Sequence, residues 1–333
     1  MKTYKICLVC SAGGHLNQIK ELILPLSKVS DVYLVTLNRE DSRTLLKSSI
    51  RHYFIRDIRD QGSLISNFTD SLKVFRKEMP DVVITTGAGS ALSTCLLARL
   101  SFKKVFYIES FARVEEPSAF GKFIYRFADK VLYQWPKLKN FYPKGIYAGS
   151  IFNITLNSEE KKAEQVFVTV GSTEFQFDRL LKNIDDLIDK GIIAQKVIAQ
   201  IGNCEYIPRN FDYFKWCSYS EMQKLMQQSK FTITHSGTGS IVNAIQMGAK
   251  VIAVPRLAKF GEHLDNHQIE IANEFATLGL LKMISNEDEL KTAILEIENF
   301  KPTGKLSNQE FFKELSGVLK MEIAKEPKVL VVN

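Results

Sequence analysis

Long apolar segments are absent from this sequence of 333 residues. No run approaches the roughly 18 apolar residues that a membrane-spanning helix needs, so we expect no such helix. The first residues, Met1–Lys5, lead into only five apolar residues, Ile6–Cys10, which fit a buried strand and not a signal peptide. With 45% hydrophobic and 24% charged residues, the composition is that of a globular protein, which we expect to be cytoplasmic.

Cysteine is also scarce, with five residues in the chain. Cys7 and Cys10 form a C-x-x-C pair, but the pair lies inside a strand-like run and not at the start of a helix. We interpret the cysteines as reduced and structural, in agreement with a cytosolic compartment.

Positive charge is unevenly distributed. The first 150 residues contain 23 Lys and Arg against 13 Asp and Glu, whereas the remainder contains 21 against 24. A basic half suits a polyanion or an anionic membrane surface, although basic residues also serve solubility alone. We expect an anionic membrane surface, and no nucleic acid, among the partners.

The length suits two domains of roughly 150 residues each. In the first half, short apolar runs alternate with amphipathic stretches such as His15–Leu26, in which apolar residues recur at helical spacing. The predicted strands are Ile6–Cys10, Val32–Thr36, Tyr53–Ile55, Val82–Thr86, Val105–Ile108 and Lys130–Tyr133. Such alternation predicts a parallel sheet covered by helices.

The same alternation begins again after a polar segment from Asn157 to Gln165, which we interpret as a linker. The predicted strands are Val166–Val170, Val197–Ile201, Tyr213–Trp216, Phe231–Thr234, Val251–Val254 and Lys282–Ile284, and the helices between them include Ile241–Met247 and Asn266–Phe275. The sequence thus predicts two Rossmann-like, doubly wound α/β domains, residues 1–152 and 160–300, facing a cleft. In the tail, residues 301–333, an amphipathic helix over Asn308–Ala324 is expected to cross back to the first domain; a loose or membrane-touching tail is the alternative.

Glycine-rich turns follow two strands of the first half. Gly13-Gly14-His15 precedes a helix, and Gly87-Ala88-Gly89 follows Val82–Thr86. Glycine turns of this kind direct backbone amides at a helix N-terminus, where negative charge is favoured. The first turn is not G-x-G-x-x-G, and no acidic residue closes the second strand, which argues against a dinucleotide site. His15 is a candidate catalytic residue, with a structural role as the alternative.

A denser polar set lies in the second half. The residues that follow strands or open helices there are Gly171, Ser172, Thr173, His235, Ser236, Gly237, Thr238, Gly239, Ser240, Arg256, Glu262, His263, Asn266 and Gln268. Hydroxyls and amides at a helix N-terminus suit a diphosphate, and the two side-chain amides suit sugar hydroxyls. Zinc held by Glu262, His263, Asp265 and His267 is the alternative, but because no cysteine joins them we expect no metal.

These motifs carry a resemblance. The second half, with residues 235–240 and Asn266-His267-Gln268, resembles the catalytic subunit of the two-subunit enzyme that adds the second N-acetylglucosamine to a dolichol diphosphate sugar. The first half, with Gly13-Gly14-His15 and residues 107–113, resembles its membrane-recruiting partner subunit. The likeness is greatest to bacterial capsule and exopolysaccharide glycosyltransferases of this GT-B type, with both halves here in one chain.

The resemblance implies roles for the residues. It implies an inverting transferase that uses a UDP-sugar donor, no cofactor, and an undecaprenyl-diphosphate-linked sugar as acceptor, attached peripherally to the inner face of the cell membrane. His15 and Glu109 are the two candidate bases, and Gly13, Gly14, Gly87, Gly89 and Arg113 line the acceptor site. Asn243 stands where relatives often carry a glutamate that binds ribose. No Asp-x-Asp occurs, so helix dipoles and cations such as Arg256 would stabilise the departing UDP.

A basic and aromatic segment supports membrane contact. Between Phe120 and Tyr142 there are eight aromatic residues, interleaved with lysine and arginine, and Asp129 is the one acidic residue from Pro117 to Gly145. Such segments suit a lipid headgroup surface, although some of these aromatics belong to the core.

The sugar is not determined by the sequence. Galactose, glucuronic acid and N-acetylglucosamine occur among similar enzymes, and the capsule likeness favours galactose in a β linkage. The alternatives to a transferase are a UDP-N-acetylglucosamine epimerase of the same fold, a non-catalytic partner that recruits a transferase, and a nicotinamide dehydrogenase.

Overall fold

The computed structural model of the protein describes residues 4–39, 42–43, 50–59, 63–156, 165–286 and 288–324. The chain divides into two compact units. The first comprises Met1–Phe111, Glu115–Phe152 and Ser307–Asn333, and the second comprises Ala112–Val114 and Asn153–Leu306.

A parallel sheet forms the centre of the first unit. Within the described residues it has seven strands in the order β3-β2-β1-β4-β5-β6-β7. Their bounds are β1 (Lys5–Cys10), β2 (Asp31–Leu37), β3 (His52–Ile55), β4 (Val82–Gly87), β5 (Lys104–Ile108), β6 (Lys130–Tyr133) and β7 (Ile146–Tyr147). The central strands are apolar and almost completely buried, as a sheet covered on both faces requires.

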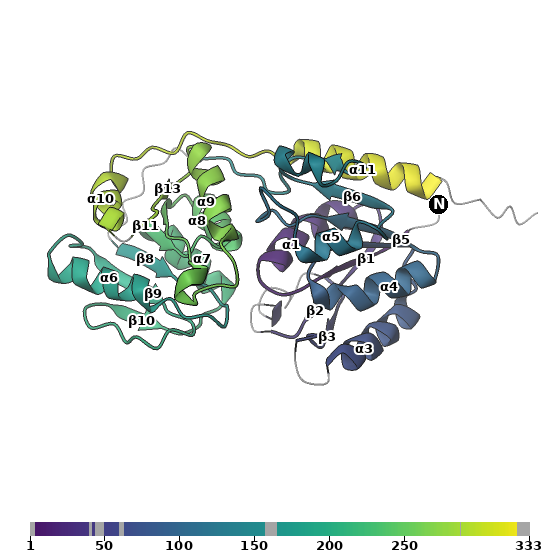
Figure 1. The fold of residues 1–333 in the computed structure, drawn as a ribbon, viewed down its shortest axis with the longest axis horizontal. Helices are drawn as coiled ribbons and strands as arrows, with labels where there is room; N and C mark the ends of the chain where they lie inside the picture. The colour runs from purple at the N-terminus through teal and green to yellow at the C-terminus, as the bar shows by residue number, and fades with distance from the viewer. Residues whose placement is uncertain are drawn as a thin grey trace, which may run out of the picture. The chain divides into compact units, whose positions relative to one another are not determined.

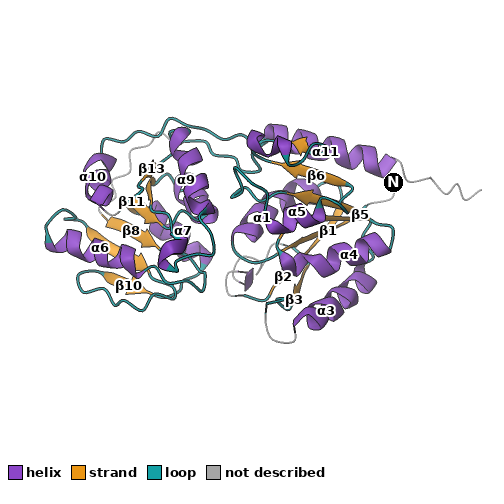
Figure 2. Cartoon of the chain, in the orientation of Figure 1, coloured by secondary structure: helices purple, strands orange, loops and turns teal. Residues whose placement is uncertain are grey.

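Helices connect these strands and lie outside the sheet (Figures 1 and 2). They are α1 (Gly14–Ser27), α3 (Ser63–Glu78), α4 (Leu92–Leu100), α5 (Ala119–Ile124) and α11 (Gln309–Ala324), with short 3-10 turns η1 (Gly89–Ala91) and η2 (Pro136–Asn140). α11 belongs to this unit although it ends the described chain. It buries Phe311, Leu315 and Val318, and Glu322 pairs with Lys104 at 3.0 Å and Lys130 at 3.5 Å.

The second unit repeats this plan. Within the described residues its sheet has six parallel strands in the order β10-β9-β8-β11-β12-β13. The strands are β8 (Gln165–Thr169), β9 (Lys196–Gln200), β10 (Asp212–Phe214), β11 (Ser229–Thr234), β12 (Lys250–Ala253) and β13 (Lys282–Met283). The helices are α6 (Asp178–Asp189), α7 (Tyr219–Gln227), α8 (Thr238–Gln246), α9 (His267–Thr277) and α10 (Asp288–Ile297), with the 3-10 turn η3 (Ala258–Phe260).

Two parallel-sheet, Rossmann-like α/β domains are the predicted fold, and the structure confirms it. Every predicted strand is present within a few residues of its expected bounds, whereas β7, only two residues long, is not among the predicted strands. The predicted linker lies outside the described residues except for its last residue, Gln165, which begins β8. None of the described helices is long and apolar enough to cross a membrane.

Candidate functional site

Glycine turns lie where the strand order of the first sheet reverses, between β1 and β4, and ligands of open α/β sheets bind at such points. Gly13, with a φ of 73°, precedes α1, and the exposed Gly14 begins it. Gly87, with a φ of 99°, ends β4, and Gly89 begins η1 against the side chain of Ile58. The glycines predicted for the acceptor therefore follow two neighbouring strands.

His15 is held between these two turns. Its Nδ1 lies 2.8 Å from the carbonyl oxygen of Thr86, and the Thr86 hydroxyl donates to the His15 carbonyl at 3.3 Å. A carbonyl oxygen can only accept, so Nδ1 of the neutral ring carries the proton and Nε2 holds the lone pair. The partly exposed side chain is thus in the tautomer that accepts a proton through Nε2.

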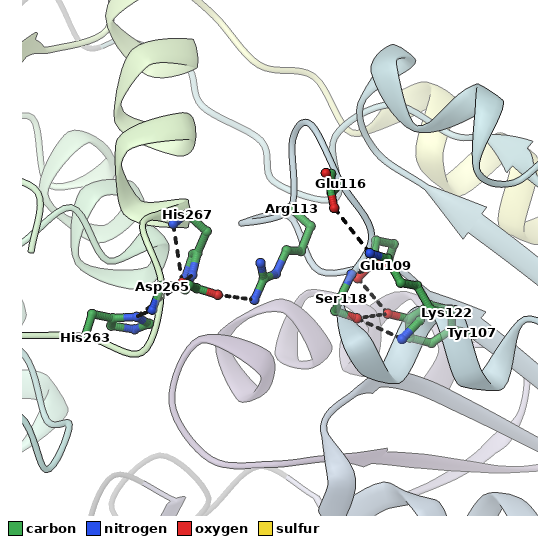
Figure 3. Close-up of polar contacts among 10 residues, drawn as sticks. Tyr107, Glu109, Arg113, Glu116, Ser118, Lys122, His263, Asp265 and His267 are labelled. Carbon is green, nitrogen blue, oxygen red and sulfur yellow. Dashed lines mark hydrogen bonds and ion pairs between the residues drawn. The ribbon is translucent and has the colours of Figure 1, made fainter. Parts of the chain in front are cut away.

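Glu109, the second predicted base, is completely buried. Its Oε1 accepts from the Tyr107 hydroxyl at 2.6 Å and its Oε2 from the Ser118 amide at 3.1 Å (Figure 3). Oε1 also accepts from the Ser110 amide at 2.8 Å, and Oε2 from the Tyr142 hydroxyl at 2.5 Å. Burial, together with the Glu109 charge, raises the pKa of both tyrosines, so that their hydroxyls remain donors. This environment organises the segment between β5 and α5 and does not suit a base that must reach a bound hydroxyl.

Arg113, predicted for the acceptor site, groups with the second unit as part of Ala112–Val114. Its guanidinium donates to Oδ2 of Asp265 at 2.9 Å (Figure 3). The structure therefore pairs Arg113 with the loop before α9, within the second unit.

His235 lies at the corresponding point of the second sheet, where the strand order reverses between β8 and β11. The ring is buried, and a Cβ atom added to Gly171 or Gly237 would overlap it. Burial, and then the charge of Arg256, lowers the pKa of His235 to about 3, so the ring is neutral at pH 7. The structure thus brings together a histidine and two glycines that the sequence predicts for the donor site.

The N-terminus of α8 has the character of an anion site. Gly237 is the N-cap and offers no side chain, and Thr238, Gly239 and Ser240 form the first turn. The hydroxyls of Ser236 and Thr238 are buried, and neither has a hydrogen-bond partner within the described residues. Ser236 has a φ of 59°, which is uncommon for serine. Buried polar groups need partners, so these hydroxyls and the helix amides suit phosphate oxygens.

Arg256 is fully buried and braces the loop between β8 and α6. It donates to the Thr173 hydroxyl at 2.6 Å, to the Phe175 carbonyl at 3.0 Å and to the Val170 carbonyl at 2.5 Å. Burial lowers its pKa to about 10, which leaves it charged at pH 7. The guanidinium predicted to help UDP depart therefore bonds protein oxygens of this loop, in which Ser172 is exposed.

A buried ion pair holds the loop after β12. Both oxygens of Glu262 accept from Arg179 at 2.8 Å, and Glu262 also accepts from the Leu257 amide at 3.0 Å. The side chain of Glu262 is 1% exposed, so it stabilises the loop from the protein interior. Sequence reasoning missed Arg179 because no motif surrounds it.

The side-chain amides of the predicted site are partly engaged by the protein. The oxygen of Asn243 accepts from the Tyr219 hydroxyl at 2.7 Å, and that of Asn266 accepts from the Ala258 amide at 3.0 Å. The oxygen of Gln268 accepts from the Arg256 amide at 3.0 Å. The NH₂ groups of these side chains are therefore the atoms that suit ribose or sugar oxygens.

His263, Asp265 and His267 form a compact cluster. Asp265 Oδ1 lies 3.3 Å from His263 Nδ1 and contacts His267 Nδ1. Burial lowers the pKa of both histidines; burial alone would raise the pKa of Asp265, but His267 and Arg113 hold it well below its usual range. The predicted donor site omits Asp265 and His267, which the sequence names only in the zinc alternative with Glu262 and His263.

Comparison with known families gives two matches. Residues 165–319 match the glycosyltransferase family 28 C-terminal domain, and residues 60–151 match the family described as oligosaccharide biosynthesis protein Alg14 like. The chain is 31% identical over 182 residues to the human UDP-N-acetylglucosamine transferase subunit ALG14. The aligned region covers 45% of this chain and 84% of the relative.

Other similarities extend over both units. A Clostridium perfringens enzyme is 22% identical over 334 residues, 89% of either chain, and is named UDP-N-acetylglucosamine--N-acetylmuramyl-(pentapeptide) pyrophosphoryl-undecaprenol N-acetylglucosamine transferase. Among solved structures, MurG of Acinetobacter baumannii gives a TM-score of 0.57 at 14% identity, covering 96% of this chain and all of that one. The UDP-GlcNAc 2-epimerase of Methanocaldococcus jannaschii gives 0.69 at 16% identity, covering 95% and 99%. These two structures show the GT-B fold.

Proposed function

Because the chain belongs to the Alg14-like family and is a GT-B glycosyltransferase of the GT28 type, we propose that it transfers a sugar from a UDP-sugar to a polyprenyl-diphosphate-linked sugar. The observation that carries this proposal is the loop before α8, where two buried hydroxyls that find no partner among the described residues adjoin a helix N-terminus. A nucleotide diphosphate supplies the acceptor oxygens that this loop lacks.

We propose UDP-N-acetylglucosamine as the first donor to test. The human and clostridial relatives are both named for that donor, and the second of them covers both units of this chain. Galactose, which the capsule likeness favours, is the second. The same clostridial name supports undecaprenyl diphosphate as the carrier of the acceptor sugar. In this proposal the product is a capsule or exopolysaccharide repeat unit.

The transfer is a single displacement. The acceptor hydroxyl loses its proton to Nε2 of His15 as its oxygen attacks the anomeric carbon. The bond from that carbon to UDP breaks, and UDP leaves towards the α8 amides and the hydroxyls of Ser236 and Thr238. Attack opposite the leaving group converts a UDP-α-sugar into a β linkage. Arg256 and Glu262 position the loops and touch no reacting atom.

An exposed aromatic pair supports peripheral attachment to the inner face of the membrane. Phe123 and Phe127 are 44% and 40% exposed, and their rings lie 5.0 Å apart. The adjacent Lys122 and Arg126 are exposed as well. Tyr133, Trp135 and Tyr142 of the same segment are buried, so only part of the segment can meet lipid. Aromatic rings beside cations suit an anionic headgroup surface.

A panel of UDP-sugars assayed with and without undecaprenyl diphosphate carrying one sugar tests the proposal. We expect UDP release and a lipid-linked disaccharide only when donor and lipid are both present. The UDP-GlcNAc 2-epimerase alternative predicts instead that UDP-N-acetylglucosamine is interconverted without any lipid. That result, or no transfer from any member of the panel, would overturn the proposal.

A further inference from the structure

The loop before α9 brings three metal-ligating side chains together, and we propose that His263, Asp265 and His267 bind a divalent transition metal such as Zn²⁺. This inference goes beyond the proposed transfer reaction, which needs no metal at this place. It also revises the expectation from sequence that no metal is bound.

The separations of the ligand atoms support the site. One ligand atom of each residue lies within 4.8 Å of the other two. Asp265 Oδ1 is 3.3 Å from His263 Nδ1, and ligands bound about 2.0–2.1 Å from a tetrahedral metal stand about 3.3–3.4 Å apart. His267 Nδ1 also contacts Oδ1 of Asp265, so the carboxylate oxygen lies against a ring nitrogen of both histidines.

The surrounding contacts hold the ligands in place. The rings of His263 and His267 meet edge to face, with their centroids 4.7 Å apart. The centroid of the Phe175 ring lies 5.7 Å from that of the His263 ring. Arg113 donates a hydrogen bond to Oδ2 of Asp265, and Oδ1 of the same carboxylate faces the two histidines (Figure 3). The side chains of His263, Asp265 and His267 are 14%, 40% and 18% exposed, and a metal can reach them from solvent.

The ligand types select the metal. Two imidazoles and one carboxylate suit Zn²⁺, Co²⁺ or Ni²⁺, whereas Mg²⁺ and Ca²⁺ prefer oxygen ligands throughout. Three protein ligands leave at least one coordination position for water or an anionic oxygen, as in zinc sites with two histidines and one carboxylate.

Equilibrium dialysis and calorimetry of the full chain with Zn²⁺ test the site, and Co²⁺ absorption in the visible reports its coordination. We expect one equivalent in the wild type. Binding weakens at least about tenfold, the lower limit for loss of even a supporting residue, in His263→Ala, His267→Ala and the isosteric Asp265→Asn. His52→Ala, a histidine of β3 in the first unit, is the matched control and keeps wild-type affinity.

Arg113→Met leaves the three ligands intact but removes the hydrogen bond that holds Oδ2 of Asp265. We expect weaker Zn²⁺ binding in this variant, because a residue that orients a metal ligand contributes to metal affinity. The proposal is overturned if the wild type binds no Zn²⁺, or if Asp265→Asn and His267→Ala bind it as tightly as the wild type. In those cases the cluster is a hydrogen-bond network alone. Each result is read from binding and stays distinct from failure of the sugar transfer.

Discussion

His15 and Glu109 show how the surroundings of a side chain separate two candidate bases. The Thr86 carbonyl fixes the proton of His15 on Nδ1 and leaves the lone pair on Nε2 of a partly exposed ring. Both oxygens of Glu109 instead accept hydrogen bonds from four donors in the core. The first arrangement suits proton transfer and the second suits support.

Glu109→Gln separates support from catalysis. The new NH₂ group cannot accept, so donors such as the Tyr142 hydroxyl lose their partner, and each unpaired buried donor costs about 1–3 kcal/mol. We therefore expect the free energy of unfolding, measured with urea, to fall by at least about 2 kcal/mol. A stable variant that binds UDP but lacks turnover would instead identify Glu109 as the base.

His235 predicts a pH dependence of stability. Its pKa of about 3 in the folded protein lies below the unfolded value of about 6.5. The group therefore contributes stability above pH 6.5, and this contribution is lost as the pH falls towards 3, by up to about 1.4 kcal/mol per pH unit.

Urea unfolding of the wild type and of His235→Gln between pH 7 and pH 4 measures this contribution. We expect the stability difference between the two proteins to shrink or reverse as the pH falls. A difference that stays constant over this range would mean that His235 is not held neutral by burial.

At the residue scale, sequence reasoning finds local signals and misses distant partners. His15 and Gly13 stand at a turn between a strand and a helix, and His235 lies in a dense motif. Arg179 meets Glu262 across 83 positions of sequence, and Tyr142 meets Glu109 across 33. No local pattern records such pairs, because the fold creates them. For the same reason the sequence predicts that Arg256 faces UDP, whereas the partners of its guanidinium include the Thr173 hydroxyl and carbonyls of the loop before α6.

At the scale of elements, the loop from β11 to α8 combines strain with unpaired hydroxyls. Ser236 has a positive φ, and its buried hydroxyl has no partner in the part of the chain that the structure describes. A folded protein retains this combination at a cost in stability. The cost has a physical reason if a bound diphosphate supplies the missing acceptors. Removal of the Ser236 hydroxyl should therefore leave the stability of the unliganded protein equal or higher and lower its affinity for the diphosphate.

Ser236→Ala tests this directly. The unliganded variant should be at least as stable as the wild type, since an unpaired buried hydroxyl is removed. UDP should bind about tenfold more weakly, the equivalent of a hydrogen bond to a charged group. Thr232→Val is the matched control, because the Thr232 hydroxyl in β11 is also buried and has no partner within the described ranges. This substitution should leave UDP affinity unchanged. Equal UDP affinity in Ser236→Ala and the wild type would contradict the loop's assignment.

The elements themselves follow closely from the sequence. The sequence shows strands such as β1 and β8 as runs of apolar residues, and helices such as α1 as apolar residues at helical spacing. The structure contains these elements at the expected places. β7 has two residues and no period to detect. Strand order is a different kind of information. It depends on how the connections cross the sheet, and it decides that the turns after β1 and β4, and after β8 and β11, lie together.

At the scale of the whole molecule, the basic first half and the pair Phe123 and Phe127 predict binding to anionic vesicles. Removing both rings in Phe123→Ser/Phe127→Ser takes apolar surface from the headgroup region. We expect at least fivefold weaker binding to phosphatidylglycerol vesicles, and weaker binding of the wild type as salt rises.

Vesicle sedimentation measures the effect. Phe260→Ser is the matched control, since Phe260 of the second unit is 48% exposed and should leave vesicle binding unchanged. Wild-type binding by the double variant would place the membrane contact elsewhere.

The most direct measurement compares the wild type with His15→Ala in acceptor-dependent transfer at pH 7, with UDP affinity measured on both proteins. We expect the wild type to form a β-linked disaccharide on the polyprenyl diphosphate. His15→Ala should turn over at least about a hundredfold more slowly, as loss of a general base predicts, and bind UDP with nearly unchanged affinity. Near-full transfer by His15→Ala, or no lipid-linked product from the wild type with any UDP-sugar, would contradict the proposed reaction.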